Sequence, residues 1–213
     1  METIDKKKFS DCSRAYLEKQ FGLEQVRKHE ILSSWIEKSK LVIADDFETL
    51  ALGRFQELII ENVDSWNEIE LTEYFIGPLF SLVNFNTKKI KIFSWREVKG
   101  IVQNVELYGE PDAIIAKGKF TPEIPYFCFN EYKKQEESKG DASGQCLAPM
   151  LVAQELNEHT LPIYGIYVVG RAWYFMILSG KEYCITKTYN ADDEEILDIF
   201  KILKALKEII LSY

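Results

Sequence analysis

The sequence has few of the residues from which many enzyme sites are built. It has two histidines, His29 and His159, and neither lies near other candidate ligands or nucleophiles, which argues against a histidine-rich metal centre and against a Ser/His/Asp triad. Its four cysteines lie far apart and form no CxxC pair, which argues against a thiolate zinc site and a disulfide framework. We therefore expect the cysteines to be buried, reduced thiols.

Long apolar runs are also missing. No window reaches the ~18 uninterrupted apolar residues that a membrane-spanning helix needs. The basic cluster near the start of the chain has no apolar run behind it, as a secretory signal would have. The sequence therefore predicts a soluble, cytoplasmic protein that does not contact a membrane.

The formal net charge of −8 shows that basic residues are not in excess. Proteins that wrap duplex DNA usually carry a basic face, because their lysines and arginines release counterions from the phosphates. The charge thus counts against DNA binding without excluding it, since a nuclease needs positive potential only along its cleft. Lysines do gather at residues 88–91, 117–119 and 133–134, where solvated strand ends are the alternative interpretation.

What is present indicates one main domain with an additional helical segment. Hydrophobic residues make up 46% of the 213 residues and aromatic residues 13%, as in an ordinary globular protein. In the N-terminal segment, residues 1–65, apolar residues recur at helical spacing, and Asp45 and Asp46 are suitable for the start of a helix that runs toward Val63. We expect this segment to be a helical cap that supplies no catalytic acid.

Residues 66–213 should form the main domain. After residue 90 the chain is rich in β-branched and aromatic residues, which predicts strands. The predicted strands cover residues 90–95, 101–107, 125–129, 162–169, 173–178 and 183–188. One helix, over residues 142–157, separates these strands, and another should run from about residue 192 to the end. This order of elements predicts an α/β fold.

The residues most informative about chemistry are Asp112, Glu131 and Lys133. Asp112 and Glu131 are 19 residues apart, enough for a strand, a turn and the adjacent antiparallel strand, which would bring the two carboxylates side by side. Such a pair suits Mg²⁺, with Mn²⁺ as a substitute. Alternation along a strand puts Glu131 and Lys133 on one face. Tyr132 would point away, while its backbone carbonyl could bind the ion.

This pattern resembles the PD-(D/E)xK nuclease superfamily, which includes restriction endonucleases and exonuclease-like members. Pro111-Asp112 matches the first half of the motif, and Glu131-Tyr132-Lys133 matches the second. The resemblance implies a restriction-endonuclease-like mixed central sheet flanked by helices. It also implies that Asp112 and Glu131 bind the metal, that Lys133 positions the attacking water, and that Gln145 organises the site from the following helix.

A second resemblance lies upstream, where residues 66–79 are similar to the helix that opens the nuclease domains of type I restriction enzymes. That helix commonly supplies another acid. Glu68 is the preferred candidate because helical spacing places it on one face with Thr72 and Ile76. Glu70 and Glu73 are the alternatives.

Together these features predict a metal-dependent DNA phosphodiester hydrolase that acts in phage defence or DNA repair. A nuclease-fold module without turnover, with a binding or regulatory role, is the alternative. Either half of the motif also arises by chance, as a turn or as a solvated ion pair on a strand. The sequence leaves open the cleavage mode, the form of the substrate, and whether the protein works as a homodimer or with a partner protein.

Overall fold

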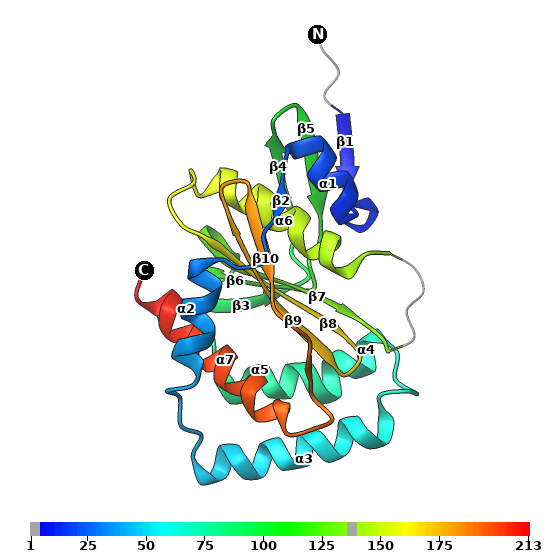
Figure 1. Ribbon diagram of the computed structural model, residues 1–213, viewed down its shortest axis with the longest axis vertical. Coiled ribbons are helices and arrows are strands. Elements are labelled where there is room, and N and C mark those ends of the chain that lie inside the picture. Colours follow the sequence, from blue (N-terminus) through cyan, green and yellow to red (C-terminus); the bar gives the residue numbers. More distant parts are fainter. Residues whose placement is uncertain (1–4, 136–139) are drawn as a thin grey trace.

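The computed structural model describes residues 5–135 and 140–213 and contains two β-sheets with helices packed against them (Figure 1). Within these residues the larger sheet has eight strands, in the order β2-β10-β9-β8-β7-β6-β3 with β11 paired to β9. These strands are β2 (Glu24–Gln25), β3 (Lys91–Ser94), β6 (Ala113–Lys117), β7 (Glu123–Lys133), β8 (Ile163–Val169), β9 (Ala172–Ser179), β10 (Glu182–Ile185) and β11 (Tyr189–Asn190). The smaller sheet has the order β1-β5-β4 and consists of β1 (Asp5–Lys8), β5 (Val105–Gly109) and β4 (Val98–Val102).

The larger sheet is mixed, and β7 lies at the change of direction. On one side β7 pairs antiparallel with β6, and on the other it pairs parallel with β8. The parallel pair is connected by α6 (Ala142–Leu156). Each predicted strand overlaps an observed one, but residues 101–107 contain a turn between β4 and β5 and belong to the smaller sheet. The expected α/β fold with a mixed sheet and flanking helices is therefore confirmed.

Helices cover both faces of the larger sheet. They are α1 (Arg14–Phe21), α2 (Glu30–Ser39), α3 (Asp46–Asn62), α4 (Glu68–Leu71), α5 (Gly77–Val83) and α7 (Glu195–Leu211), with a short 3-10 turn at Phe9–Asp11 and a π-helical segment at Thr72–Ile76. Helices α2, α5 and α7 pack on one face, and α6 and α1 pack on the other. The smaller sheet lies on the far side of α6, and α3 lies outside α5 and α7 (Figure 1).

Helix α6 is buried from every side. All its residues from 143 to 154 are buried, and its sequence lacks a polar stripe because it contacts one sheet on each side. Gly165 of β8 allows the close approach, since a Cβ at this position would lie 2.6 Å from the sulfur of Met150. The helix predicted for residues 142–157 is thus confirmed, and it holds the two sheets together.

The sequence predicted a wholly helical N-terminal segment, residues 1–65, and this prediction is wrong. The segment contains α1, α2 and α3, and Asp45 caps α3 through a reciprocal capping box with Glu48. It also supplies β1, which pairs in parallel with β5, and β2, which pairs in parallel with β10. The segment therefore takes part in both sheets and does not only cover them.

The structure also describes the four cysteines and the apolar content of the helices. All four cysteines are free and buried, as expected. None of the helices in residues 5–135 and 140–213 is both long enough and apolar enough to cross a membrane.

Candidate active site

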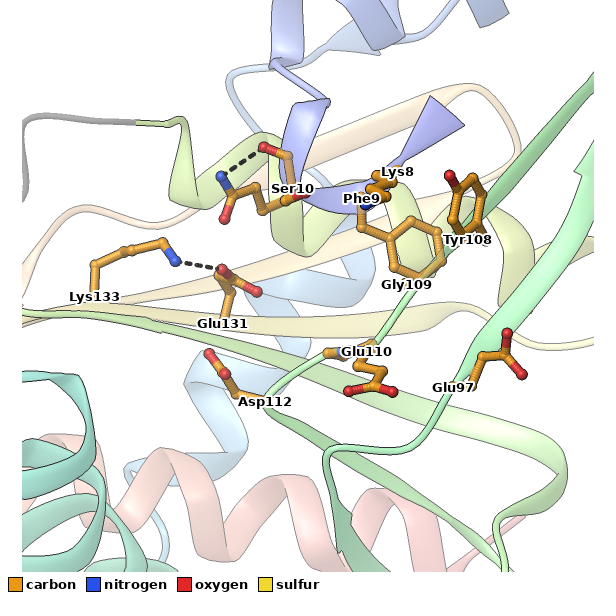
Figure 2. Close-up of a pocket in the computed structure, with 12 residues that line it drawn as sticks. Lys8, Phe9, Ser10, Glu97, Tyr108, Gly109, Glu110, Asp112, Glu131 and Lys133 are labelled. Carbon is orange, nitrogen blue, oxygen red and sulfur yellow. Dashed lines mark hydrogen bonds and ion pairs between the residues drawn. The ribbon is translucent and has the colours of Figure 1, made fainter. Parts of the chain in front are cut away.

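Asp112 and Glu131 lie next to each other where β6 begins and β7 ends (Figure 2). Ala113 of β6 pairs with Asn130 of β7, so the antiparallel register places Asp112 opposite Glu131. The amide of Tyr132 donates to Oδ2 of Asp112 over 2.6 Å. The two side chains came together as the sequence predicted, because the hairpin between them has the expected antiparallel pairing.

The two carboxylates lie in an open pocket of about 480 Å³ between the larger sheet, the smaller sheet and the N-terminal 3-10 turn (Figure 2). The pocket is lined by Lys8, Phe9, Ser10, Glu97, Tyr108, Gly109, Glu110, Pro111, Asp112, Glu131, Lys133 and Gln145. Polar groups thus converge from elements that are distant in sequence, as in many ligand sites.

Lys133 and Glu131 form an ion pair inside this pocket. Their Nζ and Oε1 atoms are 2.9 Å apart, and the side chains are only 17% and 12% exposed. Lys133 also lies 3.4 Å from a carboxylate oxygen of Glu68. A solvated pair on a strand surface was the alternative interpretation, but these two side chains are largely removed from solvent. Removing charges from water is costly, so such a cluster in a pocket is a candidate functional site.

The electrostatics of the cluster favour the binding of another cation. Burial and the nearby charge of Asp112 raise the pKa of Glu131 to about 7. Burial also raises the pKa of Asp112, although the Tyr132 amide and Lys133 act in the opposite direction. Burial would lower the pKa of Lys133, yet its carboxylate neighbours, Glu131 foremost, raise it. One lysine therefore does not fully compensate two neighbouring, partly buried carboxylates.

Tyr132 has the orientation that the sequence predicted. Its ring is buried on the opposite face of the sheet, among the residues that pack against α5 and α7. In an extended strand the N–H and C=O of one residue point to the same side. The Tyr132 amide points to Asp112, whereas the carbonyl of Lys133 accepts from Gly170 on the other side of β7. The Tyr132 carbonyl therefore points toward the Asp112 side.

Glu68 is the acid of the upstream helix that approaches the cluster. It is the first residue of α4 and is held there by the N-cap Asn67. The side chain of Glu70 is engaged differently, because it accepts from the backbone amide of Asn67 to complete a capping box. Among the described ion pairs, Lys133 contacts Glu68 and not Glu70 or Glu73. Glu68 is 44% exposed and does not line the pocket, so it reaches the site through Lys133.

The upstream helix is interrupted. The prediction that Glu68 shares one face with Ile76 requires regular α-helical spacing between them, and this spacing is absent. Residues Thr72–Ile76 form a π-helical segment. Pro78 explains it, because proline has no N–H to donate and its ring collides with the preceding turn. The wider turn shifts the helical phase, so Ile76 is buried while Glu68 stays half exposed. Such segments are frequent at functional sites.

Gln145 lies early in α6 and lines the pocket, as predicted, but its amide is directed at the N-terminal segment. Its Nε2 donates to the carbonyl of Ser10 over 3.1 Å. Gly144 makes this contact possible, since a Cβ there would lie 2.6 Å from the carbonyl oxygen of Cys12. Gln145 therefore fixes the 3-10 turn that forms one wall of the pocket (Figure 2).

The contribution of the N-terminal segment to the pocket was missed by sequence reasoning. Lys8, Phe9 and Ser10 line it, although none of the described acids in residues 5–63 does. The acids of this segment are thus outside the pocket, as expected, but the segment is not merely a cap. No local signal could have shown this, because β1 is placed by pairing with a strand about 100 residues later.

The donor groups fit a hard divalent cation such as Mg²⁺ or Mn²⁺. Within the described residues no group of three or more Asp, Glu, His or Cys side chains is arranged to hold a metal. Mg²⁺ does not require one, since it usually keeps several waters and is held by one or two carboxylates. Asp112, Glu131 and the Tyr132 carbonyl supply such a set, and their excess negative charge favours a cation.

Comparison with protein-family models gives no match for this chain, and comparison with curated protein sequences gives no significant similarity. The function therefore has to be inferred from the geometry and electrostatics of the pocket.

We expect Glu131→Gln to gain stability relative to the wild type as the pH rises. The folded pKa of Glu131 is raised, so its contribution to stability is fully present below the unfolded value of 4.5 and is lost as the pH rises through about 7. Over this window the difference in unfolding free energy should shift by roughly 1 to 3 kcal/mol in favour of the variant. Urea unfolding in EDTA measures it, with the exposed Glu61→Gln as control. A difference that is constant from pH 4.5 to 7 would contradict the burial argument.

Proposed function

We propose that this protein is a Mg²⁺-dependent phosphodiester hydrolase of the PD-(D/E)xK type that cleaves DNA. One observation carries the proposal: two partly buried carboxylates, Asp112 and Glu131, face an open pocket together with Lys133, whose Nζ lies 2.9 Å from Glu131. Acids from neighbouring strands with a lysine two residues after the second acid form the set of groups needed to hold a cation and to stabilise a pentavalent phosphate.

Asp112, Glu131 and the Tyr132 carbonyl would hold the cation at the edge of the sheet. A bound Mg²⁺ supplies positive charge that offsets the charge developing on the phosphate and lowers the pKa of water. Lys133 contributes three N–H donors next to that position, with which it orients the attacking water and stabilises phosphate oxygens. The open side of the pocket admits the substrate.

Glu68 and Gln145 have supporting roles in this proposal. Lys133 has two carboxylate partners, so Glu68 would still hold its ammonium group if Glu131 held a cation. Gln145 holds the pocket wall through Ser10, which keeps the substrate path in place. Both residues therefore act through their neighbours and need not touch the reacting atoms.

The arrangement of the strands around the site supports a restriction-endonuclease-like fold. The strand with Glu131 and Lys133 is central, has an antiparallel neighbour that follows Asp112, and is connected through a helix to a parallel neighbour. A cytoplasmic role in phage defence or DNA repair would suit such an enzyme.

The direct test is incubation of the purified protein with single-stranded, duplex and nicked DNA in Mg²⁺, in Mn²⁺ and in EDTA. We expect cleavage with either cation and none in EDTA. A protein that binds DNA and Mn²⁺ but leaves every substrate intact would support the alternative of a nuclease-fold module without turnover. A protein on which divalent cations have no effect would contradict both.

A further inference from the structure

Aromatic residues flank the two carboxylates in one row across the larger sheet. Ser94 pairs with Ala113, and Ala113 pairs with Asn130, so the next positions along these strands align Trp95, Asp112 and Glu131. The amide of Trp95 donates to the carbonyl of Asp112 over 3.2 Å, which fixes this alignment. Beyond Glu131 the row continues through Tyr167 of β8 to Tyr174 of β9.

Trp95 is held beside Asp112 in an unfavourable conformation. Its φ angle is 48°, in the left-handed region that bulky residues rarely adopt, and its side chain is 51% exposed. Packing in the core explains neither the strain nor the exposure, because about half of this large side chain contacts solvent. Strained residues of this kind cluster at ligand-binding sites.

Tyr167 and Tyr174 form a stacked pair on the other side of the carboxylates. Their ring centroids are 4.4 Å apart and the ring planes differ by 7°. Both are half-buried and lie on the pocket face, since Tyr167 pairs directly with Glu131. Other aromatic residues of the same two strands, Tyr164, Trp173 and Phe175, are buried on the opposite face. These three have a core role, whereas Tyr167 and Tyr174 stay partly exposed.

The charges around the pocket are unsuited to gripping a duplex. Its lining has two lysines, Lys8 and Lys133, and four acids. Lys133 is already paired with Glu131 and Glu68. A duplex-binding protein obtains most of its affinity from many phosphate contacts, whereas proteins that bind single strands gain much of theirs from bases stacked on aromatic rings.

We propose that the substrate of this site is single-stranded DNA, with unpaired bases stacked on Trp95 on one side of the scissile phosphate and on the Tyr167–Tyr174 pair on the other. This inference rests on the proposed function. Adjacent strands are about 4.8 Å apart. Trp95 is one strand away from Asp112, and Tyr167 and Tyr174 are one and two strands away from Glu131. The bases of a duplex are already stacked on each other inside the helix and cannot use these rings.

Binding to a short oligothymidine tests the proposal without requiring cleavage. We measure affinity in Ca²⁺ and in EDTA, together with tryptophan fluorescence. Trp35 and Trp173 are fully buried and Trp66 is partly buried, whereas Trp95 is 51% exposed. Quenching on binding should therefore come mainly from Trp95, and Trp95→Phe separates its signal from that of Trp66. Trp95→Ala should weaken binding about tenfold or more, while Trp95→Phe should retain most of the affinity and lose most of the quenching. Phe120→Ala removes an even more exposed aromatic ring, 78% against 51% for Trp95, at the other end of the β6–β7 hairpin and should change neither the affinity nor the quenching.

Tyr174→Ala tests the other side of the row and should weaken binding by about fivefold or more. Unchanged affinity in both Trp95→Ala and Tyr174→Ala, or a wild type that prefers duplex to single-stranded DNA, would overturn the proposal. A different result would contradict the proposed hydrolase function but not the single-strand binding. If no substrate is cleaved but the Trp95-dependent binding is present, the site is a single-strand binding site and the hydrolase assignment is wrong.

Discussion

Asp112→Asn should abolish both Mn²⁺ binding and DNA cleavage while leaving the protein folded. The asparagine has the same shape, and its carbonyl oxygen can accept the hydrogen bond that the Tyr132 amide now donates to Asp112. It also removes a buried charge that raises the pKa of Glu131, so the metal-free variant should be at least as stable as the wild type. A metal contributes several kcal/mol to transition-state stabilisation, so the cleavage rate should fall about 10³-fold or more.

Titration calorimetry with Mn²⁺ and single-turnover cleavage measure these two effects, and thermal unfolding in EDTA verifies the fold. Glu110→Gln is a matched control, because Glu110 lines the same pocket two residues before Asp112 but is not among the proposed ligands. This variant should bind Mn²⁺ nearly as the wild type does. Equal and negligible Mn²⁺ binding by the wild type and by Asp112→Asn would refute the metal site.

Lys133→Ala should separate metal binding from turnover. Removing a positive charge next to Glu131 should leave Mn²⁺ affinity unchanged or make it tighter. The cleavage rate should nevertheless fall on the order of 10²-fold or more, because the loss of one preorganised donor at a reacting oxyanion has effects of this size. A decrease in rate with metal binding retained is expected of a group that acts on the substrate and the water.

Lys134→Ala is the control for this experiment. Lys134 is exposed and lies outside the pocket that contains Lys133, so its loss should change little beyond weak attraction of phosphates. If Lys133→Ala cleaves DNA as fast as the wild type under single-turnover conditions, the lysine has no part in the reaction. The Glu131–Lys133 contact would then be a buried structural ion pair.

The parts of the fold and site that the sequence predicted are those determined by local pattern. Alternation along a strand places Glu131 and Lys133 on one face, and a short hairpin places Asp112 opposite Glu131. The capped start of α3 and the apolar helix α6 also follow from nearby residues. In each of these cases the groups that determine the structure lie within about 20 residues of each other.

The parts that could not be predicted depend on pairing between distant segments. Trp95 and Tyr167 flank the carboxylates only because β3, β6, β7 and β8 are neighbours in one register, and no local signal gives that register. Lys8 and Ser10 line the pocket for the same reason. The helical phase predicted after Glu68 is wrong because Pro78 widens the preceding turn into a π-helical segment, which regular helical spacing does not include.

The long-range pairing of the N-terminal strands also affects how the protein is made. Glu24 of β2 pairs with Glu182, 158 positions later, and Lys8 of β1 pairs with Tyr108. At a synthesis rate of about 5 to 20 residues per second, β2 has to wait roughly 10 to 30 s before its partner leaves the ribosome. During this interval β2 is an unpaired strand edge on the nascent chain, and β1 is one for the roughly 5 to 20 s until β5 has left the ribosome. The pocket wall that contains Ser10 is therefore completed late, and a slower ribosome prolongs the period in which these edges are open to aggregation.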